Sequence, residues 1–142
     1  MTALAQSYSQ PLVEGNVLVK AKTIAASTTI YGGTLAMNDA GKVKVFTSAG
    51  YVAGAKLLGF PVSTIANSTA SDVTYSSNVL HFRRRCPMVV NGKSGDLPTT
   101  SEVGGSVYVK DNFTVGKTDA GSELAVTLLE CNSDGTYTIM LP

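Results

Sequence analysis

The chain has 142 residues, of which 11 are basic and 10 acidic, and this balance excludes a general electrostatic attraction to nucleic acid or to an anionic membrane. A chain of this length is expected to form one domain that buries roughly two-thirds of the surface of the unfolded chain. Charged residues make up only 15%, Gly occurs 14 times and Trp is absent, so an all-β fold is expected.

Residues 1–14 show no sustained periodicity and are predicted to be an arm that a partner could order. They lack the basic segment and the apolar core of a secretory signal, so export is not expected. The most apolar window, residues 51–62, is far shorter than the ~20 residues of a membrane-spanning helix. The remaining residues, 15–142, are predicted to form one β domain.

Two strand signals follow the arm. Residues 16–22 alternate between apolar and polar, as in a half-exposed strand. Residues 23–31 are rich in β-branched side chains and are interrupted by small residues at 25–27. We therefore expect a strand with a break in it.

The clearest hairpin of the chain lies between residues 34 and 47. Leu35 and Met37 lead into a short Gly-containing segment at 39–42, and Val43 and Val45 lead out of it. A loop of this kind joins antiparallel strands.

Two prolines mark interruptions in the central part of the chain. Pro61 lies in the apolar run 57–65, and because proline has no amide hydrogen, this strand is predicted to lie at a sheet edge or to begin at Pro61. Residues 79–90 form the longest β-compatible run and contain Pro87.

The sharpest polar feature is the run Arg83, Arg84 and Arg85. Period-two alternation places His81, Arg83 and Arg85 on one face, and Arg84 on the opposite, apolar face. A charge on that face must be paired, lie at the strand end or meet another subunit. The three arginines are either solvated or ion-paired, or they recognise an acidic protein surface, or they contact nucleic acid.

The last third of the chain reads as a loop followed by two hairpins. Residues 91–103 are the longest loop-like segment, and such loops often carry function. In residues 104–117 apolar and polar side chains alternate on both sides of an Asp-Asn pair, which predicts strand, turn and strand. Residues 124–131 and 136–141 flank a loop with an Asp-Gly pair, a strong hairpin signal.

The chain carries no recognisable catalytic or metal-binding motif, so neither an enzyme nor a cofactor is expected. His81 has no nucleophile near it in the sequence. Asp39, Asp111 and Asp134 each lie at a turn, where Asp is favoured for bonding to the backbone rather than for binding calcium. Cys86 and Cys131 are expected to be free thiols, with a disulfide as the alternative.

The order of these features resembles the decoration, or head cement, proteins of tailed bacteriophages. The resemblance covers most of residues 15–142 and rests on three stretches: Gly-Gly-Thr-Leu-Ala at 32–36, Leu-Gly-Phe-Pro-Val at 58–62 and Gly-Gly-Ser-Val-Tyr-Val-Lys-Asp-Asn at 104–112. It implies a single antiparallel β-barrel or sandwich, with a jelly roll as one form. It also implies dimers or trimers on the outer surface of the capsid, assembled in the host cytoplasm, that clamp neighbouring major capsid proteins.

We infer the contact residues from this chain itself. Leu4, Tyr8 and Leu12 would anchor the arm on the capsid or on a neighbouring subunit by strand addition. Arg83, Arg84 and Arg85 would face acidic groups or another subunit, and the 91–103 loop would add contacts. The alternatives are a carbohydrate-binding β module with a tyrosine platform, and a phage tail or fibre protein. Neither nucleic acid nor a membrane is an expected partner.

Overall fold

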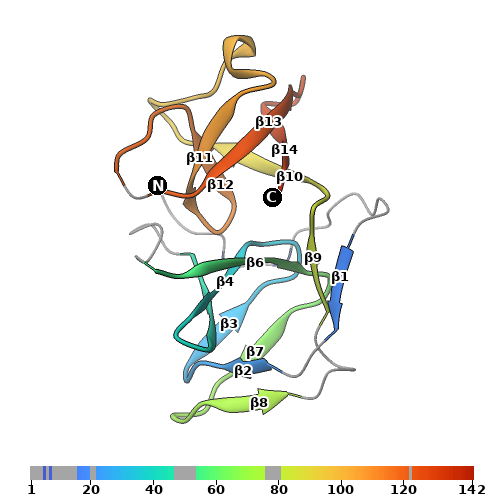
Figure 1. The fold of residues 1–142 in the computed structure, drawn as a ribbon, viewed down its shortest axis with the longest axis vertical. Helices are drawn as coiled ribbons and strands as arrows, with labels where there is room; N and C mark the ends of the chain where they lie inside the picture. Colours follow the sequence, from blue (N-terminus) through green and yellow to red (C-terminus); the bar gives the residue numbers. More distant parts are fainter. Residues whose placement is uncertain are drawn as a thin grey trace.

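The regular secondary structure of the described residues consists almost entirely of β-strands (Figure 1). The structure is a computed structural model that describes residues 5, 7, 16–19, 22–46, 54–75, 81–121 and 123–142. These residues contain strands and one short 3₁₀ helix but no α-helix. The expectation of an all-β fold is therefore confirmed.

The first nine strands form the lower part of the molecule in Figure 1. Their bounds are β1 Asn16–Val19, β2 Lys22–Ile24, β3 Thr28–Ile30, β4 Ala36–Asp39, β5 Lys42–Val45, β6 Lys56–Pro61, β7 Ile65–Asn67, β8 Val73–Tyr75 and β9 His81–Arg84. Seven of them pair in one curled sheet in the order β1-β9-β6-β4-β5-β2-β8, and β3 pairs with β7.

The last five strands form a closed barrel in the upper part of Figure 1. They are β10 Pro87–Gly92, β11 Ser106–Asp111, β12 Thr114–Gly116, β13 Ala125–Cys131 and β14 Thr136–Met140, with the 3₁₀ helix Thr100–Glu102 before β11. The barrel order is β10-β12-β11-β13-β14. The pairs β10–β12 and β2–β5 are parallel, so the expected antiparallel pairing holds for the other described pairs only.

The two strongest hairpin predictions are confirmed. β4 and β5 pair with Asp39 opposite Lys42, and the two residues between them have positive φ values, 52° at Ala40 and 84° at Gly41. Positive φ at both central residues is the pattern of a type I′ turn, whose twist suits a hairpin. β13 and β14 likewise pair around the turn that contains Gly135.

The predicted strand, turn and strand of residues 104–117 are β11 and β12, which pair in the barrel. The turn begins one residue later than the sequence indicates, because Asp111 still belongs to β11. The Asp111 carboxylate accepts a hydrogen bond from the Phe113 amide at 2.9 Å, so this side chain closes the turn.

The prediction for Pro61 is wrong. β6 lies between β9 and β4 in the sheet, and Pro61 is its last residue rather than its first. A proline is tolerated there because the strand ends at it and its carbonyl accepts a hydrogen bond from the Gly33 amide at 2.7 Å.

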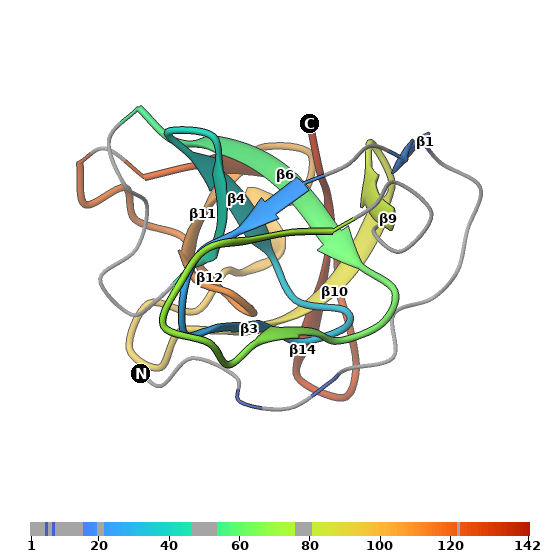
Figure 2. The same cartoon turned by 90° about the horizontal axis from the view of Figure 1, so that it is seen from below.

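The long run of residues 79–90 is divided between the sheet and the barrel. β9 belongs to the sheet and β10 to the barrel, and the chain turns between them at Arg85, whose φ is 52° (Figures 1 and 2). We call the segment from Arg84 to Cys86 the arginine corner. It lies where the two parts of the molecule join.

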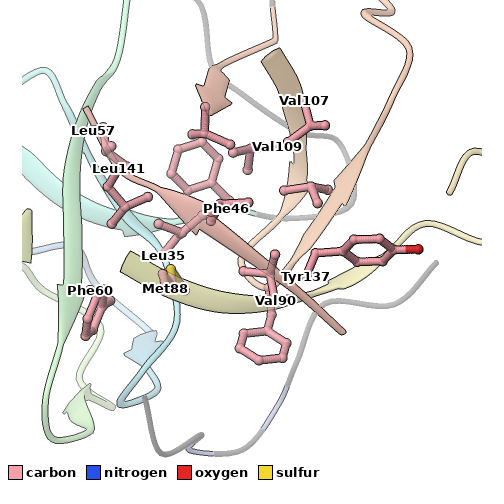
Figure 3. Packing of buried hydrophobic residues seen from close by; sticks show 14 of the residues in the cluster. Leu35, Phe46, Leu57, Phe60, Met88, Val90, Val107, Val109, Tyr137 and Leu141 are labelled. Atoms are coloured by element: carbon pink, nitrogen blue, oxygen red, sulfur yellow. The ribbon is translucent and has the colours of Figure 1, made fainter. Parts of the chain in front are cut away.

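One buried hydrophobic cluster extends from the barrel into the sheet (Figure 3), and a second cluster lies among the strands of the lower part. Met88, Val90 and Val109 of the barrel belong to the same buried cluster as Leu35 and Phe60 from the sheet side. The Leu35 amide also donates to the Asn112 carbonyl at 2.8 Å, which ties the β11–β12 turn to the lower part. These contacts hold the arginine corner in a defined position.

Candidate interaction surface

The three apolar anchors predicted in the arm, Leu4, Tyr8 and Leu12, lie outside the described residues. Of the arm, Ala5 and Ser7 are described, and both are exposed. The Ser7 hydroxyl forms a hydrogen bond with the Thr64 hydroxyl in the β6–β7 connection. One described point of the arm therefore lies beside the lower part of the molecule.

The three arginines lie together at the junction of sheet and barrel, but they differ in surroundings. Arg83 is half-buried and lies between Val17 of β1 and Phe60 of β6 in the sheet register. Arg84 is half-buried and is the last residue of β9. Arg85 is exposed.

Arg84 lies at the strand end, which was one of the three placements expected for a charge on the apolar face. Its stem passes over Gly59, where an added Cβ would lie 2.9 Å from Arg84 Cγ. Its Nη2 atom approaches a main-chain oxygen of Pro142, the last residue of the sequence, at 3.5 Å, so the side chain spans from the sheet to the end of the barrel. The Nε atom is buried and has no hydrogen-bond partner among the described atoms.

Arg85 follows the last residue of β9 and has a left-handed backbone conformation. Strand alternation therefore does not extend to it, and the prediction that it shares a strand face with His81 and Arg83 is wrong. The backbone turns here because the next residues enter the barrel.

The ion pairs within the described residues are made by lysines rather than by Arg84 or Arg85. They join Lys42 to Asp72, Lys44 to Asp39, and Lys110 to Glu123 and Asp96. In the described part of the chain, Arg85 thus presents a charge that no carboxylate neutralises, whereas Arg84 approaches Pro142, the last residue of the sequence.

Lys110 differs from its prediction. Alternation in β11 placed it on the exposed side with Ser106 and Tyr108, but its side chain is only 4% exposed. Its ammonium group contacts Glu123 Oε1 at 2.5 Å and the Thr118 carbonyl at 2.6 Å. Thr118 and Glu123, which lie between β12 and β13 in the sequence, contact the lysine and help to bury a side chain that would otherwise face water.

Asp96 completes this cluster, with one carboxylate oxygen 4.0 Å from Lys110 Nζ. Burial raises the pKa of Asp96, but hydrogen bonds from the Thr118 hydroxyl and amide, with the charges of Lys110 and Lys93, outweigh burial and hold this pKa below its usual value. The cluster joins the loop after β10 to the loop after β12. Its polar groups therefore stabilise loop structure.

The three aspartates predicted at turns also bond within the protein. Asp134 accepts hydrogen bonds from the Thr136 amide at 3.0 Å and hydroxyl at 2.6 Å. Asp39 pairs with Lys44 at 2.8 Å, and Asp111 accepts from Phe113 as described above. No group of three or more metal-ligating side chains comes together among the residues that the structure describes.

The predicted 91–103 loop is shorter than expected, because β10 continues to Gly92. Its second part is held by a capping box, in which the amide and hydroxyl of Thr99 donate to the Glu102 carboxylate at 2.7 Å and 2.6 Å. Leu97 and Val103 remain exposed in this segment.

The sequence did not indicate an uncharged outer face on the barrel. Strand register places Pro87, Met140, Thr127 and Ser106 in one row across β10, β14, β13 and β11. Their side chains point outward, because the neighbouring Met88, Ile139, Leu128 and Val107 are buried. Alternation in each strand predicts which side chains face out, but only the pairing shows that these four form a row beside the arginine corner.

Both cysteines are free thiols, as predicted from the sequence. Cys86 is buried and bonds through its carbonyl to the Leu141 amide, whereas Cys131 lies opposite Tyr137 at the other end of β14. The two residues therefore lie near opposite ends of the same strand.

Comparisons with family models, curated proteins and solved structures found no match for this chain. Within the described residues, no helix has the length and apolar character needed to span a membrane. The fold and surface described above therefore provide the basis for any functional proposal.

Proposed function

We propose that this chain is a structural virion protein that binds the outer surface of a tailed-phage head and stabilises contacts between major capsid proteins. The observation that carries the proposal is the arginine corner, where the exposed Arg85 has no carboxylate partner among the described residues. An exposed guanidinium group suits recognition of carboxylates on another protein.

The rigidity of the described body supports a clamping role. One buried cluster contains residues of both the barrel and the sheet, and Lys110, Asp96 and Asp134 hold loops and turns in place. A clamp requires surfaces of fixed shape rather than groups poised for bond making. Polar side chains that hydrogen-bond within the protein to hold loops and turns support a role in binding rather than in catalysis.

The proposed assembly also includes other copies of the chain, as dimers or trimers. Repeated weak contacts on a shell reinforce one another, because each bound contact raises the effective concentration of the next. Moderate attraction at each arginine corner would therefore suffice. Assembly on the capsid would take place in the host cytoplasm, and no cofactor would take part.

Co-sedimentation tests this proposal directly. Expanded, DNA-free heads would be assembled from the major capsid protein encoded near this gene, without the present chain, and mixed with the purified protein. We expect the protein to sediment with the heads, and we expect added salt to release it because screening weakens exposed charge pairs. Failure to sediment at low salt would reject the proposal.

Two variants locate the contact. Arg85→Glu reverses an exposed charge at the corner and should weaken binding, whereas Lys56→Glu makes the same change at an exposed residue of β6 and should leave binding unchanged. Deletion of residues 2–13 tests the arm separately. Equal binding by all these proteins would contradict the assigned contacts.

The carbohydrate-binding alternative depends on grouped tyrosines. The four described tyrosines lie on separate elements: Tyr31 after β3, Tyr75 in β8, Tyr108 in β11 and Tyr137 in β14. Tyr137 is buried, and the Tyr75 hydroxyl donates to the Ala66 carbonyl. Binding on a glycan array would favour this alternative, and binding to isolated tails would favour a tail or fibre role.

A further inference from the structure

Lys110 lies at a β-bulge of the barrel. In the pairing of β11 with β12 the register shifts between Val109 and Asp111, so Lys110 is the extra residue of the bulge. A bulge changes the direction of a side chain, and bulges are frequent beside active sites. The lysine side chain is only 4% exposed. The bulge thus directs a buried amine toward the loops that follow β10 and β12.

Two carboxylates from these different loops meet the amine. Glu123 Oε1 is 2.5 Å from Lys110 Nζ, and Asp96 Oδ2 is 4.0 Å from it. The glutamate and aspartate side chains are only 16% and 15% exposed. A Cβ at Gly116 would lie 2.7 Å from Lys110 Cε and 3.2 Å from Asp96 Cγ. Any side chain in place of this glycine would hold the amine and the aspartate apart.

The two carboxylates have different surroundings, which suit them to different roles. Asp96 accepts hydrogen bonds from Thr118 at both of its oxygens, from the hydroxyl at 2.7 Å and from the amide at 3.2 Å. Such donors stabilise the negative charge that develops on oxygen when a nucleophile adds to the carboxyl carbon. Glu123 instead lies at hydrogen-bond distance from the lysine nitrogen, where it can take up an ammonium proton.

We propose that Lys110 and Asp96 condense to form an intramolecular amide cross-link, with Glu123 carrying protons between them. The lysine nitrogen forms a bond to Asp96 Cγ, and the bond from Cγ to one carboxylate oxygen breaks. Of the three ammonium protons, two leave with that oxygen as water and one stays on the amide nitrogen. The step is a condensation, so it needs no oxidant, reductant or cofactor. The ion-paired site described above is the state before condensation.

Proximity and burial both favour the cross-link. Reacting groups that a fold holds in place reach effective concentrations of roughly 10⁵–10⁸ M. Condensation also replaces two desolvated charges, which are costly to bury, by one neutral amide. The product joins the loop after β10 covalently to β11, and closing a loop in this way limits the freedom of the unfolded chain. The inference goes beyond the proposed function and does not depend on it.

Intact-mass spectrometry of the full chain, denatured and reduced, tests the inference. After a week at neutral pH, we expect the folded protein to be lighter than its sequence by the mass of one water molecule. Fragment spectra of a protease digest should then link the peptide of Lys110 to the peptide of Asp96. Dehydration at Asp134, which precedes Gly135, would give the same mass, but mild base hydrolyses the resulting succinimide and leaves the amide intact.

Two variants make the assignment specific. Lys110→Arg keeps a cation but removes the nucleophilic amine, and Glu123→Gln removes the proton acceptor, so both should retain the full mass of their sequences. The matched changes at exposed residues, Lys117→Arg and Glu130→Gln, should still lose water. A two-dimensional amide NMR spectrum of each variant reports whether the fold is retained.

An unchanged mass of the wild type, a loss of water located at Asp134, or a link from Lys110 to Glu123 would each overturn the inference. Loss of water in folded Lys110→Arg or folded Glu123→Gln would do the same. Head binding is a separate measurement, because protein that binds heads without the cross-link leaves the capsid role standing. Cross-linked protein that does not bind heads supports the amide and rejects the capsid role. The intact mass also gives the fraction of protein that remains ion-paired, in which Lys110 and Asp96 keep their charges.

Discussion

The ammonium group of Lys110 lies 2.5 Å from the Glu123 carboxylate, inside a barrel protein whose sequence placed this lysine on the outside of a strand. The Thr118 carbonyl and Asp96 complete its surroundings, so three segments depend on one charge. Loss of one partner from such a cluster leaves the others desolvated without compensation.

Lys110→Met should therefore destabilise the protein. The carboxylates of Asp96 and Glu123 keep some contact with water. We therefore expect the free energy of unfolding to fall by about 3 kcal/mol, which is the lower end of the range for loss of one partner from a buried ion pair. Urea denaturation at neutral pH measures this change. Lys117→Met, at an exposed residue next to the same loop, should change stability by less than ~0.5 kcal/mol, and an equal loss in the two variants would contradict the assignment.

Asp96 should make stability depend on pH in a defined direction. Its pKa in the folded protein is lower than in the unfolded chain, where it is about 3.9. The ionised carboxylate therefore stabilises the fold above that pH, and the contribution is lost as the pH falls through the folded-state pKa. Asp96→Asn should be less stable than the wild type at neutral pH, and the difference should shrink below about pH 4.

Denaturation curves of the two proteins across this range check the prediction. Asp134 and Glu102 also have lowered pKa values, held by hydrogen bonds from Thr136 and Thr99 respectively, and they contribute to acid sensitivity in both proteins. Because both proteins retain Asp134 and Glu102, the contributions of these two groups cancel when the stability of Asp96→Asn is subtracted from that of the wild type. If the difference in the free energy of unfolding between the wild type and Asp96→Asn grew toward acid pH, the predicted direction of the Asp96 pKa shift would be wrong.

Gly59 should tolerate no side chain. A Cβ at this position would lie 1.8 Å from the Arg83 carbonyl oxygen, and the residue has a φ of 106°. Backbone atoms cannot move away without breaking the β6–β9 pairing, so Gly59→Ala should cost more than ~4 kcal/mol or prevent folding. Gly41→Ala is the matched control, because its Cβ would meet no atom within 4 Å and only the positive φ adds a cost of about 1 kcal/mol. Thermal denaturation that ranks Gly41→Ala as the less stable variant would contradict this account.

Ala40 offers a route to a more stable protein. It has a φ of 52° at the first central position of the β4–β5 turn, where Asn is favoured over Ala. Ala40→Asn should raise the free energy of unfolding by about 0.5–1 kcal/mol. Ala40→Val should lower it, because a β-branched residue is strained at positive φ. Both changes can be measured by chemical denaturation, and stabilisation by Val would show that the turn geometry is different.

The two thiols should react at different rates in the native protein. Burial raises the pKa of Cys86, and the charge of Arg83 offsets this only in part, so little thiolate is present at neutral pH. Cys131 is half-buried and lies near the end of β13. Labelling with a thiol reagent under native conditions should modify Cys131 first and Cys86 only on unfolding. Cys131→Ser should remove the fast phase, and retention of that phase would contradict the placement.

The turns of this protein were determined by short stretches of sequence. The Ala40-Gly41 pair, Asp111 and the Asp134-Gly135 pair act through their own backbone conformation or through hydrogen bonds to residues two positions away. Local backbone conformations and short-range hydrogen bonds depend on few neighbouring residues. The hairpins, the interruption after β2 and the all-β fold class could therefore be predicted from the sequence. The alternation of apolar residues in β11, β13 and β14 likewise indicated the side chains that face the barrel core.

Only the tertiary structure decided which strands meet. The sequence predicts one β-compatible run over residues 79–90, but the left-handed residue Arg85 separates β9 in the sheet from β10 in the barrel. Lys110 became buried because a loop seven or more residues away in the sequence folds over it. The row from Pro87 to Ser106, and the approach of Arg84 to Pro142, arise from pairing between segments far apart in the chain. Sequence periodicity reports which side of a strand faces the core, whereas the neighbours across strands depend on long-range packing between segments that are distant in the sequence.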